Sequence, residues 1–204
     1  MAGKSALAAE QEELLARIER DVAHQLESKP KRLAHTLSVA DTAAELARAY
    51  GADEFAARVA GLLHDWHKAY GAKEQIALAE ELGLDYGVDL ALVAPLLHGA
   101  LTAATLPARY PELPGEVWSA IARHTAGAKD MSALDMVVFI ADAIEPLRPA
   151  TPAIEGLRAK AGSSPLPELY FETFAESMAY VIETRRYLWP ETLVTYNGLV
   201  LKRK

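Results

Sequence analysis

Apolar side chains recur at helical spacing along most of this 204-residue chain, and proline and glycine interrupt them at short intervals. No run alternates apolar and polar residues long enough to suggest a sheet. Over residues 5–28, leucine, isoleucine and valine fall on one side of a helix, which Pro30 ends. The pattern predicts an all-α fold of about nine helices.

The helix boundaries follow from start and stop signals. Pro30 suits the first turn of a helix that stops at Gly51, and Asp53 suits the N-cap of a helix leading to His64. Further helices are expected at 72–82, 88–97, 99–108, 115–124, 132–145 and 167–188, with one short helix after Pro149. The tail after Pro190 stays undetermined. We expect three parts: a helical extension at 1–29, a core at 30–150 and a cap at 151–204.

Composition and charge exclude several classes of protein. The absence of cysteine excludes a disulfide framework, a thiolate nucleophile, a Cys-ligated zinc site and an iron–sulfur cluster. A formal net charge of −7 leaves no global basic field for duplex nucleic acid. The longest apolar stretch, 91–108, contains two prolines, a glycine and a histidine, and the N-terminus lacks the apolar segment of a signal peptide. We therefore expect a cytoplasmic protein with no nucleic acid and no membrane as partner.

Ionisable residues stand isolated in apolar sequence at several places. Four of the six histidines lie at helix ends or on apolar helix faces: His35, His64, His98 and His124. Asp142 is the only polar residue in MVVFIADAI at 136–144. A buried carboxylate is normally paired, protonated or bound to a metal. Asp142 therefore either pairs with an arginine such as Arg148 or Arg123, or ligates a metal.

Together with Asp65, these residues form a candidate metal constellation. Imidazole and carboxylate suit divalent iron, manganese, cobalt, nickel or zinc. Six ligands are too many for one tetrahedral zinc and suit two ions that share a bridging carboxylate. Asp65, adjacent to His64, is the natural bridge. The residues alone leave this site and a set of packed or ion-paired side chains equally open.

The order of these residues resembles that of a known family. His35 in KRLAHTLSVADTAAELA, the doublet in AGLLHDWHK, then His98, His124 and Asp142 follow the order of the HD-domain metal-dependent phosphohydrolases. More narrowly, LLHG at 96–99, AIARHTAG at 120–127 and MSALDMVVFIADAIEPLR at 131–148 resemble the YqeK-type HD proteins, bacterial symmetrical hydrolases of diadenosine tetraphosphate. The resemblance covers about residues 30–185 and implies an HD-domain helical bundle.

The resemblance implies two divalent metal ions and a catalytic role for Asp65 and Lys68. His35, His64, Asp65 and Asp142 would hold the first ion, and Asp65, His98 and His124 the second. Iron is the metal associated with the family. A hydroxide shared by the ions would attack an inner phosphorus, and central cleavage would give two ADP. Lys68 would stabilise charge on the transferred phosphoryl group, its alternative being a surface lysine.

Four further residues are candidates for substrate binding. Arg148 and the weaker candidate Arg32 can grip a polyphosphate, although Arg148 is almost equally open as the structural partner of Asp142 or Glu145. Thr125 and Gly127 can bring a hydroxyl and backbone N–H groups to a phosphate. Turn geometry explains Gly127 equally well.

The chain departs from the family pattern directly after Asp65. The family usually has small or apolar residues before the lysine, whereas this chain has Trp66 and His67. We expect His67 to lie outside the ligand set, and His24 to be a solvated surface residue. Trp66 and Tyr70 can stack on a base or pack internally.

Other functions stay open at this point. The nearest is another HD phosphohydrolase, which would act on a nucleoside monophosphate, a deoxynucleotide or an alarmone. A di-iron oxygenase would consume oxygen, and Lys68 would then have no phosphate charge to stabilise. A nucleotide-sensing module with a degenerate site and a bundle whose histidines merely pack are the remaining readings. The sequence also leaves a homodimer open.

Overall fold

The computed structural model describes residues 2–203, and for residues 2–8 it describes the backbone alone. Within this range the chain forms ten α-helices and no strand, which confirms the all-α prediction with one helix more than expected. The helices are α1 (Ala2–Gln25), α2 (Pro30–Tyr50), α3 (Glu54–Leu63), α4 (Ala72–Glu81), α5 (Leu97–Thr105), α6 (Gly115–Arg123), α7 (Ala133–Ile144), α8 (Pro152–Lys160), α9 (Leu166–Glu183) and α10 (Pro190–Leu201). Two short 3₁₀ turns, η1 (Trp66–Ala69) and η2 (Ala94–Leu96), complete the element order.

Capping residues begin and end several helices where the sequence predicts. Pro30 occupies the first position of α2, and Gly51 ends that helix with a φ of +72°. The side chain of Asp53 accepts a hydrogen bond from the backbone N–H of Ala56 at 2.8 Å and so caps α3. Ser132 caps α7 in the same way, through the N–H of Asp135.

After α4, three of the predicted helices differ from the observed ones. Residues 88–96 form turns that end in η2 instead of an α-helix, because the side chain of Asp89 accepts from the N–H of Ala91 and Pro95 has no N–H to donate. The next helix, α5, accordingly runs from 97 to 105 and not from 99 to 108. The helix expected over 167–188 ends at Glu183, where Arg185 takes a φ of +55°. The undetermined tail forms α10.

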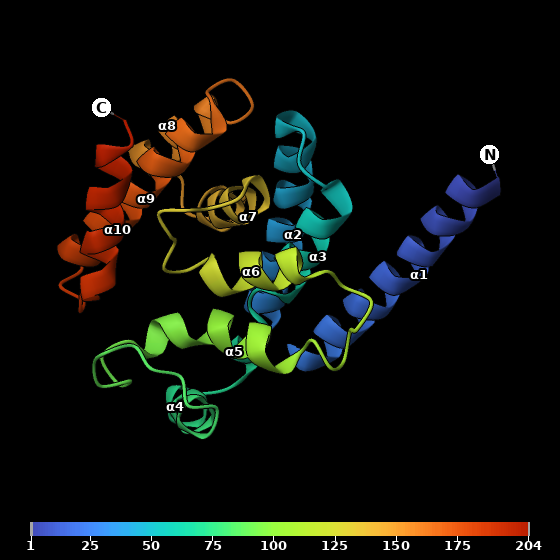
Figure 1. Cartoon of the computed structure of the whole chain (residues 1–204), viewed down its shortest axis with the longest axis horizontal. Helices are drawn as coiled ribbons and strands as arrows, with labels where there is room; N and C mark the ends of the chain where they lie inside the picture. The colour runs from blue at the N-terminus through green and yellow to red at the C-terminus, as the bar shows by residue number, and fades with distance from the viewer. Residues whose placement is uncertain (1, 204) are drawn as a thin grey trace.

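The centre of the molecule is a bundle in which α2 packs on α3 and α7, and α6 packs against α5 and α7 (Figure 1). One apolar cluster unites residues of α1, α2, α3, α6, α7 and α9, among them Ile18, Val39, Val59, Ile121, Phe139 and Phe174. The division into an extension, a core and a cap stays a prediction. Among the described residues, none of the helices has the length and apolar character needed to cross a membrane.

Two glycines set how closely the central helices approach. A Cβ atom on Gly61 of α3 would lie 2.6 Å from Cα of Ala40 on α2. A Cβ atom on Gly99 of α5 would lie 2.6 Å from the carbonyl oxygen of Ile121 on α6. Only glycine permits these contacts. The two crossings bring the carboxyl-terminal ends of α3 and α6 close to α2 and α5.

Candidate metal centre

All six predicted ligands meet where five helices converge. His35 lies on α2, His98 on α5 and Asp142 on α7, while His64 with Asp65 follows α3 and His124 follows α6. The four imidazoles and Asp65 are buried, with at most 8% of each residue exposed. The side chain of Asp142 is 22% exposed. Burial of so many ionisable groups in one place requires a compensating partner.

Asp65 lies between two groups of imidazole nitrogens. Its Oδ2 atom is 3.3 Å from Nε2 of His64 and 3.6 Å from Nε2 of His35. Its Oδ1 atom is 3.3 Å from Nε2 of His98, and that nitrogen is 2.9 Å from Nε2 of His124. Each carboxylate oxygen therefore faces a different part of the cluster.

Hydrogen bonds determine which nitrogen of three imidazoles carries the proton. Nδ1 of His64 donates to the carbonyl oxygen of Gly61, and Nδ1 of His124 donates to that of Ile121, each at 2.6 Å. Nδ1 of His35 lies 2.9 Å from Oε1 of Glu145. A carbonyl oxygen can only accept, so Nε2 of His64 and of His124 presents its lone pair to the cluster. This tautomer is the one that binds a metal through Nε2.

Two buried nitrogens of the cluster have no hydrogen-bond partner among the described residues. Nε2 of His35 and Nε2 of His64 are fully buried and accept or donate no hydrogen bond. Nε2 of His35 lies 3.0 Å from Oδ1 of Asp142, yet the two atoms are not aligned for a hydrogen bond. Atoms that converge without bonding to one another are typical of ligands around a common ion. The donor set therefore fits a divalent metal.

The ligand atoms form two overlapping groups in which all atoms lie within 4.8 Å of one another. One group is His35, His64 and Asp142, and the other is His64, Asp65 and His124. His98 lies outside both groups but within 3.3 Å of the second through Asp65. Both groups share His64, so the geometry fits a metal and the number of cations stays a prediction.

The electrostatics keep Asp65 and Asp142 ionised and lower the pKa of two imidazoles. Burial lowers the pKa of His64, but the neighbouring Asp65 and Asp142 outweigh burial and raise it. Burial raises the pKa of Asp65, but the neighbouring His64, His98 and Arg32 outweigh burial and hold the pKa well below its ordinary range. Burial lowers the pKa of His124 to about 4, and burial together with His124 lowers the pKa of His98 well below its ordinary value. Ionised carboxylates and neutral imidazoles are the forms that bind metals.

Two arginines contact the aspartates of the cluster. Nη1 of Arg32 donates to Oδ2 of Asp65 at 2.7 Å. Nη2 of Arg148 donates to Oδ1 of Asp142 at 2.6 Å, and Nε of Arg148 donates to the backbone carbonyl of Asp142 at 2.8 Å. The arginine alternative for Asp142 therefore holds through Arg148, whereas its role as a metal ligand stays a prediction, with Oδ1 lying 3.0 Å from Nε2 of His35. Arg123, the other arginine considered, pairs with Asp135.

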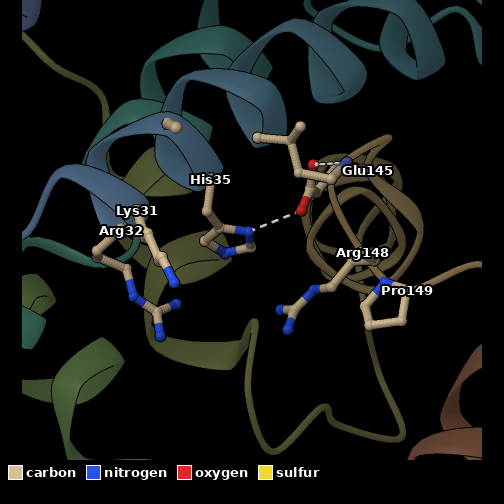
Figure 2. A pocket seen from close by; sticks show the side chains of 8 residues that line it. Lys31, Arg32, His35, Glu145, Arg148 and Pro149 are labelled. Carbon is tan, nitrogen blue, oxygen red and sulfur yellow. Dashed lines mark hydrogen bonds and ion pairs between the residues drawn. The ribbon is translucent and has the colours of Figure 1, made fainter.

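A cavity of about 390 Å³ lies next to the cluster, between α2 and the turn that follows α7. Lys31 and Arg32 of α2 and Arg148 of the turn extend toward the same space beside His35 (Figure 2). Leu147 and Pro149 add apolar side chains to the lining of the cavity. The cavity therefore offers three cations to an anion that reaches the histidine cluster.

Lys68 and Thr125 also lie at the site. Lys68 is partly buried on η1, and its Nζ atom donates to the carbonyl oxygen of Pro95 at 3.3 Å. Burial lowers the pKa of Lys68, and Asp65 opposes that shift. The hydroxyl of Thr125 is 3.2 Å from Nε2 of His98 and 3.1 Å from Nε2 of His124.

Turn geometry and close packing together explain why residue 127 is a glycine. Its φ is +64°, a Cβ atom there would lie 2.7 Å from the side chains of Phe174 and Tyr170, and its N–H donates to the carbonyl of Arg123. The turn alternative explains this glycine, and its N–H is not free for a phosphate.

The Trp66–His67 pair points into the protein. Trp66 is 8% exposed and belongs to the apolar core, so the packing alternative holds for it, whereas Tyr70 is exposed. His67 is buried against α5, where its Nδ1 atom lies 3.0 Å from the hydroxyl of Thr102, and burial lowers its pKa to about 4. His24 is exposed, as expected.

The sequence reasoning missed the part that Glu145 plays at the site. Glu145 is 1% exposed and contacts a candidate ligand, His35. The available signal was a carboxylate directly after the apolar helix that carries Asp142. Lys31 of the cavity was missed as well, because one lysine in a polar helix turn carries no distinctive pattern.

Fold and site together define a member of the HD domain family, to which the chain belongs: the family model matches residues 32–147. The expectation of an HD-domain hydrolase is thus confirmed at the level of the family. An enzyme of Halalkalibacterium halodurans named "Bis(5'-nucleosyl)-tetraphosphatase, symmetrical" is 32% identical over 85% of this chain and 91% of its own length. The Bacillus subtilis enzyme of the same name is 33% identical, over 83% of this chain and 89% of its own length.

A solved structure shares the fold. It is the crystal structure of a protein from Clostridium acetobutylicum, described as a predicted HD superfamily hydrolase involved in NAD metabolism. The TM-score is 0.82 and the sequence identity 31%, and the match covers 93% of this chain and 97% of that one. The likeness thus extends beyond the residues of the family model, into α1 and the C-terminal helices.

Proposed function

We propose that this chain is a metal-dependent hydrolase that cleaves diadenosine tetraphosphate symmetrically into two ADP. The observation that carries the proposal is the position of Asp65, whose two oxygens each lie 3.3 Å from a different imidazole, that of His64 and that of His98. A carboxylate in this position suits a bridge between two cations, which is the arrangement of two-metal phosphoryl-transfer sites. The names of the relatives supply the substrate.

The proposed cofactor is a pair of divalent ions. His35, His64, Asp65 and Asp142 are the proposed ligands of one ion, and Asp65, His98 and His124 those of the other. Nitrogen and oxygen donors suit iron, manganese, cobalt, nickel or zinc, and we propose iron because of the family that the sequence resembles. When bound, such a pair supplies a nucleophile near neutral pH and shields phosphate charge. The backbone carbonyls of Gly61 and Ile121 keep two imidazoles in the ligating tautomer.

The cavity beside the cluster is the proposed site for the polyphosphate. The chain carries a net charge of −7, so a polyanion needs local cations to approach it. Lys31, Arg32 and Arg148 line the cavity and provide them. The guanidinium fork of an arginine matches two phosphate oxygens at once. A chain of phosphates lying in this cavity would present one phosphorus to the histidine cluster.

Lys68 is the proposed residue for charge developing in the reaction. It follows Asp65 by one 3₁₀ turn. Burial lowers the pKa of Lys68, and the nearby carboxylates of Asp65 and Asp142 oppose that shift. An ammonium group near the scissile phosphate stabilises negative charge on the transferred phosphoryl group. The hydroxyl of Thr125, which lies next to Nε2 of His98 and of His124, is the proposed donor to a phosphate oxygen.

Product analysis tests the function. Metal-loaded protein is incubated anaerobically with diadenosine tetraphosphate, and the nucleotides are resolved by ion-exchange chromatography. ADP as the sole product is the expected result. AMP together with ATP contradicts symmetrical cleavage, and no turnover with two ions bound contradicts the proposed substrate. Oxygen consumption in aerated samples would favour an oxygenase instead.

A further inference from the structure

Glu145 is a buried carboxylate whose two oxygens are both engaged. It follows the last residue of α7 and is 1% exposed. Oε1 lies 2.9 Å from Nδ1 of His35, and Oε2 accepts a hydrogen bond from the backbone N–H of Leu147 at 2.6 Å. Figure 2 shows the carboxylate pointing at the imidazole across the gap between α7 and α2.

Arg158 of α8 holds the backbone on which Glu145 lies. Its guanidinium donates to the carbonyl oxygens of Ile144 at 2.8 Å, Glu145 at 2.6 Å and Arg148 at 3.2 Å. Carbonyls at the end of a helix lack partners within the helix, and Arg158 supplies them here. The turn after α7 is therefore fixed from the C-terminal part of the chain, and the direction of the Glu145 side chain is fixed with it.

We propose that Glu145 is a positioning residue for His35: it keeps the proton on Nδ1 and so directs the Nε2 lone pair into the metal centre. An ionised carboxylate can only accept, which leaves Nδ1 as the donor. Nε2 is then the free atom, and it is the buried nitrogen that has no hydrogen-bond partner among the described residues. The inference rests on the proposed function in one respect, namely that His35 is a ligand.

The chemistry of a glutamine at position 145 makes the proposal testable. The carboxylate accepts from two donors, the imidazole of His35 and the N–H of Leu147. A glutamine has one accepting oxygen and one donating NH₂ group. If its oxygen bonds to Leu147, its NH₂ faces His35 and favours the tautomer with the proton on Nε2, which cannot ligate. Glu145→Gln therefore changes the tautomer with almost no change in side-chain volume.

The first measurement is the tautomer of His35 in metal-free protein, by long-range ¹H–¹⁵N NMR of the imidazole nitrogens. The signals that disappear in His35→Gln assign the residue. The wild type is expected to show the proton on Nδ1, and Glu145→Gln to shift it toward Nε2. The control Glu172→Gln removes a surface carboxylate that pairs with Lys160, and it leaves the His35 signals unchanged.

The second measurement is metal affinity, by titration of the same variants. Loss of a partner that orients a ligand typically lowers metal affinity about 10–100-fold, and this is expected for Glu145→Gln but not for Glu172→Gln. Wild-type tautomer or wild-type affinity in Glu145→Gln overturns the proposal. If that variant does not fold, Glu145→Asp replaces it: the shorter acid can still accept from Leu147 but does not reach His35, and the same two shifts are expected.

The two variants His35→Gln and Glu145→Gln distinguish a failure of this inference from a failure of the proposed function. If His35→Gln binds metal with wild-type affinity, His35 is not a ligand, and the proposed metal centre is contradicted whatever the NMR shows. If His35→Gln loses affinity while Glu145→Gln keeps both tautomer and affinity, the metal centre stands and the role of Glu145 is overturned.

Discussion

The guanidinium of Arg148 donates two hydrogen bonds to Asp142: Nη2 to the side-chain Oδ1 at 2.6 Å, and Nε to the backbone carbonyl oxygen at 2.8 Å. The same Oδ1 atom lies 3.0 Å from Nε2 of His35. Arg148 therefore links a proposed metal ligand to the cationic cavity that it lines with Lys31 and Arg32. The proposed substrate site and the proposed metal centre therefore share the contact between Arg148 and Asp142.

Removal of the Arg148 charge is expected to weaken substrate binding. In Arg148→Gln, kcat/KM for diadenosine tetraphosphate should fall about 10–100-fold, since a hydrogen bond to a charged group contributes about 1.5–3 kcal/mol. Steady-state kinetics on protein of known metal content measure the effect. Arg48→Gln, which removes an exposed arginine paired with Glu54, is the control. An unchanged kcat/KM would remove Arg148 from the binding site.

Replacement of Asp65, the proposed bridging carboxylate, is expected to empty the proposed metal centre. Asp65→Asn removes a negative charge that lies between two groups of imidazoles, so both proposed ions lose a ligand. Turnover should fall at least about 10²-fold, the lower range for loss of one preorganised electrostatic group. Elemental analysis after purification measures the metal. Asp41→Asn, at an exposed pair with Arg58, should keep full metal content, and equal content in both variants contradicts the bridge.

A methyl group on Gly99 is expected to force α5 away from α6. The new Cβ atom would lie 2.6 Å from the carbonyl oxygen of Ile121 and 3.1 Å from the ring of His124. Gly99→Ala should lower the free energy of unfolding by about 1–3 kcal/mol, as overpacking usually does. Urea denaturation of the metal-free protein measures the change.

Gly156→Ala is the matched control for that substitution. Gly156 lies within α8, and a Cβ atom there would meet nothing within 4 Å. Alanine should raise the free energy of unfolding by about 0.5–1 kcal/mol, because glycine in a helix interior is unfavourable. Equal changes for the two glycines would show that the α5–α6 crossing tolerates a side chain.

The contact between α1 and residues 109–110 is expected to depend on pH. The hydroxyl of Tyr110 donates to Oδ2 of Asp21 at 2.7 Å, and Arg109 lies 2.9 Å from the same oxygen. Burial raises the pKa of Asp21, but these two partners outweigh burial and lower it below its ordinary value. A carboxyl group with a lowered folded-state pKa stabilises the protein above about pH 4, and the stabilisation is lost as the pH falls through the folded-state pKa.

Asp21→Asn should therefore cost about 1–2 kcal/mol at pH 7 and progressively less below about pH 4. Urea denaturation at pH 7, 5 and 3.5 measures the difference between wild type and variant. Asp130→Asn, at an exposed side chain, controls for the loss of a surface carboxylate. A difference that stays constant over this range contradicts the assigned pKa shift.

Local signals predicted most helix boundaries, and their failures have local causes. Gly51 and Asp53 act on neighbouring backbone groups, so the ends of α2 and α3 could be read directly. The turns at 88–96 depend on a hydrogen bond to the side chain of Asp89 that competes with helix formation, and hydrophobic periodicity does not reveal such a bond. The end of α9 has no glycine to mark it, because Arg185 adopts the left-handed conformation itself.

The proposed ligands were predictable because isolation in apolar sequence is visible without a structure. The partners of these ligands were not, since they come from distant helices. Arg148 was one of two candidates for Asp142, and the structure pairs it with that residue. Glu145 reaches His35 across 110 positions of sequence, and no local pattern indicates that contact.

The sequence by itself determined the helical class, most helix ends and the exclusion of cysteine chemistry. It also showed that four histidines and two aspartates follow one another in the order of a known motif. These properties depend on neighbouring residues or on composition. Only the tertiary structure decided which oxygen of Asp65 faces which imidazole, where the cations of the cavity lie and which nitrogen of His35 is free. Those properties depend on distances between helices, and packing at close contacts such as Gly61 on Ala40 sets these distances.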